Sequence, residues 1–113
     1  WECKTYFINY WEVWCATCIK VIQELASLGS RHHDIQVFGV NYDMPDSETM
    51  SRQIKELKIS FPIFDRDPHL DFGIEKPEVL PTTLIIDPSG KLEHVLVGPQ
   101  TEESLLAVIR GRV

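Results

Sequence analysis

The sequence Trp14-Cys15-Ala16-Thr17-Cys18 is the most informative stretch of this chain. It follows an apolar run and opens an amphipathic stretch, so the two cysteines are expected near the first turn of a helix. Side chains three residues apart lie on one face of a helix. Their Cα atoms are then roughly 5 Å apart, which lies within the range of a disulfide. The pair Cys15 and Cys18 is therefore expected to cycle between a disulfide and a dithiol.

The position of Cys15 at the start of this helix predicts its reactivity. Unpaired backbone N–H groups and the helix dipole favour negative charge there, and the thiolate is the reactive form in disulfide exchange. We therefore expect Cys15 to be the nucleophile and Cys18 the resolving thiol. The third cysteine, Cys3, is interpreted as an unpaired thiol, and a partner in an upstream segment is the alternative.

Outward from this stretch, apolar runs and helical periodicity predict alternating strands and helices. The expected strands cover residues 4–11, 35–41, 61–65, 82–87 and 91–98, and the expected helices cover 17–28, 47–57, 68–72 and 101–110. Gly29 is expected to end the first helix. Asp46 or Ser47 is expected to cap the second, and Thr101 the last.

The order of these elements predicts an α/β fold. The first half implies a right-handed crossover between parallel strands. In the second half, the turn residues Asp87-Pro88-Ser89-Gly90 predict an antiparallel hairpin. We expect a central mixed sheet flanked by helices on both faces. The two cysteines then lie at the carboxyl end of the first strand, where α/β sheets tend to place their sites.

Length and charge limit the classes of protein to which the chain can belong. The chain has 113 residues, enough for one domain with a modest core, so we expect a single domain over residues 1–113. A net charge of −6 argues against nucleic acid or an anionic membrane surface as the main partner. No apolar run approaches the ~20 residues that span a bilayer. Because the chain begins with Trp1 rather than Met, we expect upstream residues in the full-length protein, including any leader or membrane tether.

Three motifs in order carry a resemblance to a known family. They are residues 9–18 (NYWEVWCATC), residues 80–87 (LPTTLIID) and the turn at 87–91 (DPSGK). Together the motifs resemble the strand–WCxxC–helix block, the cis-proline strand and the following turn of the thioredoxin superfamily. The lead-in to the cysteines and the Pro-Thr-Thr strand look most like the TlpA/ResA branch. The resemblance implies a thioredoxin fold and an extracytoplasmic thiol–disulfide oxidoreductase.

The resemblance also implies roles for individual residues. Cys15 matches the attacking cysteine, and Cys18 matches the resolving one. Trp14 matches the aromatic residue that shields the dithiol and contacts substrate. Pro81 matches the cis-proline that faces the disulfide, leaving the backbone of Leu80 free to pair with an extended substrate segment. The implied partners are a protein thiol or disulfide and an upstream electron donor, with no cofactor, no metal and a monomeric state.

Several positions depart from the family pattern. Thioredoxin has a buried aspartate where this chain has Asn9, and many TlpA/ResA relatives have a glutamate where it has Val21. The helix-kinking proline of the family is Gln23 here. Glu24 could act through water as the missing acid, although a solvated surface glutamate is the simpler interpretation. These positions help to set thiol pKa and reduction potential. The helix N-terminus stabilises the Cys15 thiolate, which favours the reduced form of the pair. A reductant is the expected direction of exchange with a partner disulfide.

Two interpretations from other classes stay open. A CxxC pair with histidines can bind zinc or copper, but the histidines lie in polar or isolated positions and are interpreted as non-ligating: His32, His33, His69 and His94. A non-catalytic interaction module would use the three tryptophans as an aromatic surface, although core packing and shielding of the dithiol explain them more simply: Trp1, Trp11 and Trp14. A thiol peroxidase fits less well, because Cys15 belongs to a compact redox pair.

Overall fold

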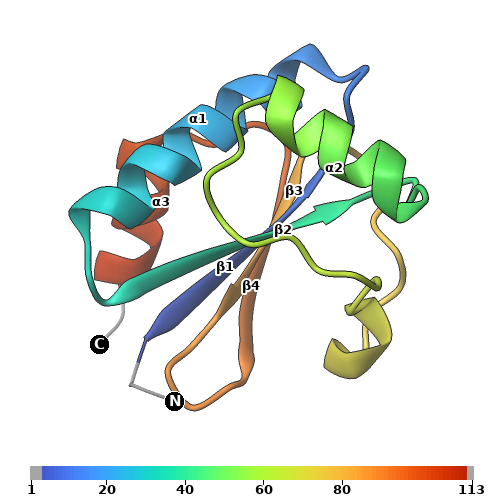
Figure 1. The fold of residues 1–113 in the computed structure, drawn as a ribbon. Coiled ribbons are helices and arrows are strands. Elements are labelled where there is room, and N and C mark those ends of the chain that lie inside the picture. Colours follow the sequence, from blue (N-terminus) through green and yellow to red (C-terminus); the bar gives the residue numbers. More distant parts are fainter. Residues whose placement is uncertain (1–3, 112–113) are drawn as a thin grey trace.

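The computed structural model describes residues 4–111, which form a four-stranded sheet in the order β2-β1-β3-β4 (Figure 1). The strands are β1 (Thr5–Trp11), β2 (Ile35–Asn41), β3 (Thr82–Ile86) and β4 (Leu92–Val97). The strands β1 and β2 run parallel, whereas β3 is antiparallel to both of its neighbours. The mixed sheet expected from the sequence is therefore confirmed. Trp1 and Cys3 lie outside the described residues.

The helices are α1 (Ala16–Arg31), α2 (Ser47–Glu56), the short 3-10 helix η1 (His69–Phe72) and α3 (Glu102–Arg110). Figure 1 shows α1 and α3 together on one side of the sheet, and η1 near the opposite side. Within residues 4–111, no helix has the length and apolar character needed to cross a membrane.

The main hydrophobic core lies between the sheet and the helices. Strand residues such as Phe7 and Ile85 are fully buried against the apolar stripe of α1 and against Leu105 of α3. Helix α2 packs on the same cluster at its margin through three partly buried side chains, Met50, Ile54 and Leu57. Burial of these apolar side chains is the main force that holds the helices on the sheet.

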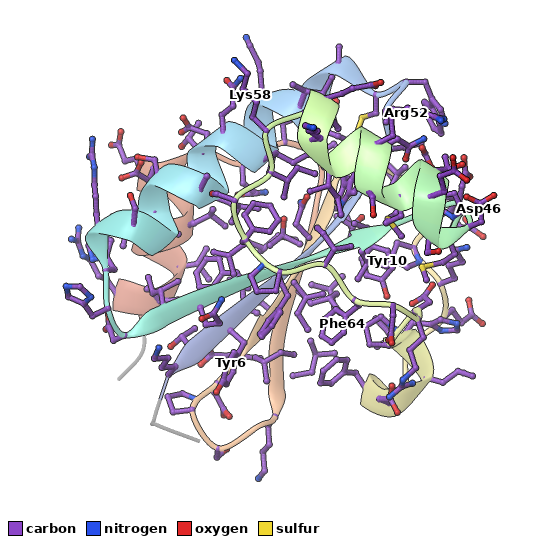
Figure 2. All side chains as sticks on the ribbon, viewed as in Figure 1. Tyr6, Tyr10, Asp46, Arg52, Lys58 and Phe64 are labelled. Atoms are coloured by element: carbon purple, nitrogen blue, oxygen red, sulfur yellow. A yellow bond between two sulfur atoms is a disulfide. The ribbon has the colours of Figure 1, made fainter. Side chains whose placement is uncertain are left out.

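The second face of the sheet carries a smaller apolar cluster. Its buried members are Ile8, Tyr10, Val40, Leu84 and Ile86. The side chains that pack on it are only partly buried and come from the strands and from the segment around η1. Figure 2 shows two of them, Tyr6 and Phe64, on the side of the sheet away from α1. Helical cover is thus present on both faces but unequal, since a single 3-10 turn covers the second one.

The first helix is longer than predicted, because Gly29 does not end it. The helix continues to Arg31, and His32 N–H donates to the carbonyl of Leu28. A Cβ atom at Gly29 would lie 3.3 Å from Cγ2 of Val37 on β2. The glycine therefore allows the helix to lie close to the sheet, and it acts as a packing residue rather than a stop signal.

The strand predicted over residues 61–65 is wrong, because a single bridge between Gly39 and Ile63 forms there. The Gly39 N–H donates to the Pro62 carbonyl at 2.9 Å, and the Phe64 N–H donates to the Gly39 carbonyl at 2.8 Å. Pro62 has no N–H to extend the ladder. A Cβ at position 39 would lie 2.6 Å from the Ile63 side chain, so only glycine allows this close approach.

The cap of α3 leads to a prediction on stability. Thr101 Oγ1 accepts the N–H of Ser104 at 3.0 Å, and Ser104 Oγ accepts the N–H of Thr101 at 2.9 Å. Thr101→Ala should lower the free energy of unfolding by about 1 kcal/mol, because the N–H of Ser104 loses its acceptor. Urea unfolding followed by circular dichroism measures the change. Thr101→Ser keeps the acceptor and should unfold like the parent, and equal loss in both variants would contradict the role of the cap.

Candidate active site

The two cysteines of the CxxC stretch lie at the start of α1 and form a disulfide, with their Cα atoms 5.2 Å apart. Cys15 is the N-cap residue, and its Sγ accepts the N–H of Cys18 at 3.1 Å. Thr17 Oγ1 lies 3.4 Å from the same sulfur. After reduction, these donors would remain close to a sulfur that carries negative charge.

The two cysteines differ in exposure. Residue Cys15 retains 8 % of its surface exposed, whereas Cys18 is fully buried in the main core. The first turn of α1 contains no acidic residue that would oppose a thiolate. An incoming partner would therefore reach Cys15 first, which is consistent with the predicted roles of Cys15 as nucleophile and Cys18 as resolving thiol.

The tryptophans near the dithiol occupy different environments. Trp11, the last residue of β1, is fully buried in the main core, which confirms its interpretation as a packing residue. Trp14, next to Cys15, is 68 % exposed. Its indole is therefore available for contact with another molecule beside the dithiol.

The loop before β3 ends at the same end of the sheet as the CxxC stretch. The Leu80–Pro81 peptide bond is cis, and Pro81 is buried. The carbonyl of Pro81 accepts the N–H of Gly98 at 2.8 Å. Since Thr82 pairs with Tyr10 near the carboxyl end of β1, Pro81 is at the sheet end from which the chain continues into the CxxC stretch.

This architecture was compared with known proteins. A family model described as the AhpC/TSA family matches residues 2–95. The chain belongs to the AhpC/TSA family. It is 28 % identical over 104 residues to the thiol-disulfide oxidoreductase ResA of a Bacillus cereus strain, covering 90 % of this chain and 60 % of that relative. The chain thus spans about 60 % of the length of this curated relative.

Solved structures support the fold of this AhpC/TSA family member. A DsbF homologue from Corynebacterium diphtheriae superposes with a TM-score of 0.80 at 23 % identity, covering 98 % of this chain and 73 % of that one. A thiol:disulfide interchange protein of the thioredoxin family from Chlorobium tepidum TLS gives 0.73 at 21 % identity, covering 96 % and 79 %. The thioredoxin fold and the likeness to TlpA/ResA proteins are therefore confirmed.

The three positions considered for the Cys18 proton are two neutral residues, Asn9 and Val21, and one acid, Glu24, which is bound to another part of the chain. Asn9 is buried and neutral, and its Nδ2 donates to Thr83 Oγ1 at 3.1 Å. Val21 is a core residue. Glu24 is half-buried, and its Oε1 accepts the N–H of Glu102 at 2.8 Å, so its carboxyl group caps α3 rather than facing the dithiol.

Sequence reasoning missed one buried acid, Glu12. Its side chain is 1 % exposed, its Oε1 accepts the N–H of Val13 at 3.0 Å, and its Oε2 accepts the N–H of Asp43 at 3.1 Å. Burial is the largest cause that raises the pKa of Glu12, followed by a hydrogen bond with the Asp43 carboxyl. The one signal available in the sequence was a charged residue between two tryptophans in an apolar stretch.

The histidines were the candidates for a metal site in the alternative interpretation. Among residues 4–111, no group of three or more His, Cys, Asp or Glu side chains is arranged to hold a metal ion. His69 instead faces its own loop, where Nδ1 lies 2.8 Å from the carbonyl of Ile74.

Proposed function

We propose that residues 1–113 form one thioredoxin-like domain that exchanges a dithiol at Cys15 and Cys18 with the disulfide of a protein partner. One observation carries the proposal: Cys15 caps α1 and accepts the N–H of Cys18, while Cys18 is fully buried. The likeness to ResA, which is named a thiol-disulfide oxidoreductase, supports the same activity.

The exchange takes place in two steps. The Cys15 thiolate attacks one sulfur of the partner disulfide, which forms a mixed disulfide and releases the other partner sulfur as a thiolate. Cys18, after losing its proton, attacks Cys15 Sγ, closes the internal disulfide and releases the second partner sulfur. The two electrons of the dithiol pass to the partner, and the two thiol protons end on the partner sulfurs.

Three residues around the dithiol are proposed to receive the partner. Trp14 offers an exposed aromatic surface next to Cys15. Within the described residues, no hydrogen bond engages the backbone N–H or carbonyl of Leu80. An extended partner segment could therefore pair with Leu80 beside Pro81, which would bring its disulfide to Cys15.

We infer that the domain acts as a reductant outside the cytoplasm. The direction is inferred from the likeness to the TlpA/ResA branch. The donors at the α1 N-terminus stabilise the Cys15 thiolate and therefore raise the reduction potential of the pair, which limits how strong a reductant it can be. The TlpA/ResA branch is usually extracytoplasmic, which supports that location. Such a reductant needs an upstream electron donor to restore the dithiol after each cycle.

The reduction potential of the Cys15/Cys18 pair tests the proposal. Tryptophan fluorescence, followed in graded thiol buffers with Cys3→Ser as background, should report a two-electron transition because Trp14 adjoins Cys15. A midpoint near or below roughly −220 mV is expected for a reductant. A midpoint near about −120 mV would instead make the domain an oxidant. The absence of any two-electron transition would contradict the oxidoreductase function.

A further inference from the structure

Glu12 is the only carboxylic acid in residues 4–111 whose side chain is fully buried. It stands directly after β1, and it opens the turn that leads to the dithiol. Its backbone carbonyl accepts the N–H of Cys15 at 3.2 Å. The turn of residues 12–15 is therefore closed at one end by Glu12 and at the other by the proposed nucleophile.

The side chain of Glu12 joins this turn to the loop that follows β2. One carboxyl oxygen accepts the N–H of Val13 inside the turn, and the other accepts the N–H of Asp43 in the neighbouring loop. The Asp43 N–H is shared with Asn41 Oδ1 at 3.0 Å. A single carboxyl group thus holds together two loops that are 31 residues apart in the chain.

Opposing interactions act on the pKa of Glu12. Burial, the largest cause, and the Asp43 carboxyl raise the pKa, whereas the N–H groups of Val13 and Asp43, which the carboxyl oxygens accept, lower it in part. Lys76, from the loop between η1 and β3, is bound to Tyr42, because its Nζ donates to the carbonyl of that residue and lies 4.2 Å from the centroid of its ring. The charged side chain that acts on Glu12 is Asp43.

We propose that Glu12 is a positioning residue for Cys15, and that the charge on its carboxyl group is coupled to the ionisation of the Cys15 thiol through the turn that the two residues close. This inference rests on the proposed function, because it concerns the reactivity of the nucleophile. When Glu12 releases its proton to solvent, a carboxylate in the same turn opposes ionisation of the thiol. The rate at which Cys15 reacts then rises over a wider pH range than it would for one thiol that titrates independently.

The test measures the rate at which iodoacetamide alkylates Cys15 at a series of pH values. The full chain with Cys3→Ser and Cys18→Ser has Cys15 as its sole thiol. Adding Glu12→Gln should give a profile that fits the titration of a single proton. At pH values where Glu12 would be ionised and Cys15 still protonated, this variant should be alkylated about threefold to tenfold faster than the protein that retains Glu12. A shift of one pKa unit corresponds to a tenfold change in the thiolate fraction. The matched control Glu56→Gln removes a charge from the exposed end of α2 and should follow the parent. Identical profiles for all three proteins would overturn the proposal.

A second variant keeps Glu12 in place, in case Glu12→Gln fails to fold. Asp43→Asn removes the like charge that helps to hold the proton on Glu12, so the first inflection of the profile should move to lower pH. An unchanged profile would again overturn the proposal. The proposed function is tested separately by the position of the thiol titration. A Cys15 that titrates like a free cysteine, at about pH 8.5, in every variant would count against that function whatever the role of Glu12.

Discussion

Replacing Cys15 by serine should lower turnover with a protein disulfide by roughly a thousandfold or more, as expected for loss of a nucleophile. A serine hydroxyl forms no bond that replaces the disulfide, so the first step cannot begin. Cys15 retains 8 % of its surface exposed and Cys18 none, so Cys15 is the cysteine that a partner is expected to reach. Reduction of a small disulfide-bonded protein in the presence of dithiothreitol, followed by turbidity, measures the loss.

The matched variant, Cys18→Ser, separates the two roles. It retains the nucleophile at the N-terminus of α1, so the first step proceeds and the mixed disulfide with the partner accumulates. Mass spectrometry of the non-reduced sample should find this adduct in Cys18→Ser and not in Cys15→Ser. Full turnover by Cys15→Ser, or an adduct on Cys18 in that variant, would reverse the assignment.

Replacing Trp11 by alanine should lower the free energy of unfolding by about 3–5 kcal/mol. Trp11 is fully buried in the main core, where the cluster also contains Cys15 and Cys18. Its removal leaves a cavity in the core. The nearby Gly39 has no side chain to fill it, although a Cβ atom there would lie 2.9 Å from Nε1 of Trp11. Urea unfolding of the reduced protein, followed by circular dichroism, measures the change.

Trp11→Phe provides the control for this prediction. The indole Nε1 of Trp11 has no hydrogen-bond acceptor among the described residues. A phenyl ring at this position therefore fills less volume, but no hydrogen bond to the protein is lost. The expected loss is about 1–2 kcal/mol, well below that of alanine. Equal losses in the two variants would mean that the indole N–H, rather than its apolar volume, stabilises the core.

Elements with strong local signals were predicted correctly. The turn at residues 87–90 formed as expected because Asp87 Oδ1 accepts the N–H groups of Ser89 and Lys91, and Gly90 adopts a φ of 92°. Thr101 caps α3 for the same reason, since its partner Ser104 lies three residues away. Hydrogen bonds over such short separations depend on few other residues, so the sequence alone predicts them.

Errors arose where distant segments decide the outcome. Gly29 lies inside α1 because Val37 packs against it, and residues 61–65 form a bridge rather than a strand because of how they meet Gly39. Neither contact can be seen in a local pattern. Local secondary-structure propensity is a weak indicator, and tertiary contacts of this kind override it.

The local sequence by itself determined the order of the helices and of the four strands that form, the hairpin, and the placement of two cysteines at the first turn of a helix. Periodicity, turn residues and caps act over a few neighbours. Only the tertiary structure decided that Cys18 is buried while Cys15 remains accessible, and that Glu12 lies buried against Asp43. Burial and the pairing of charges depend on segments far apart in the chain, which come together only when the core packs.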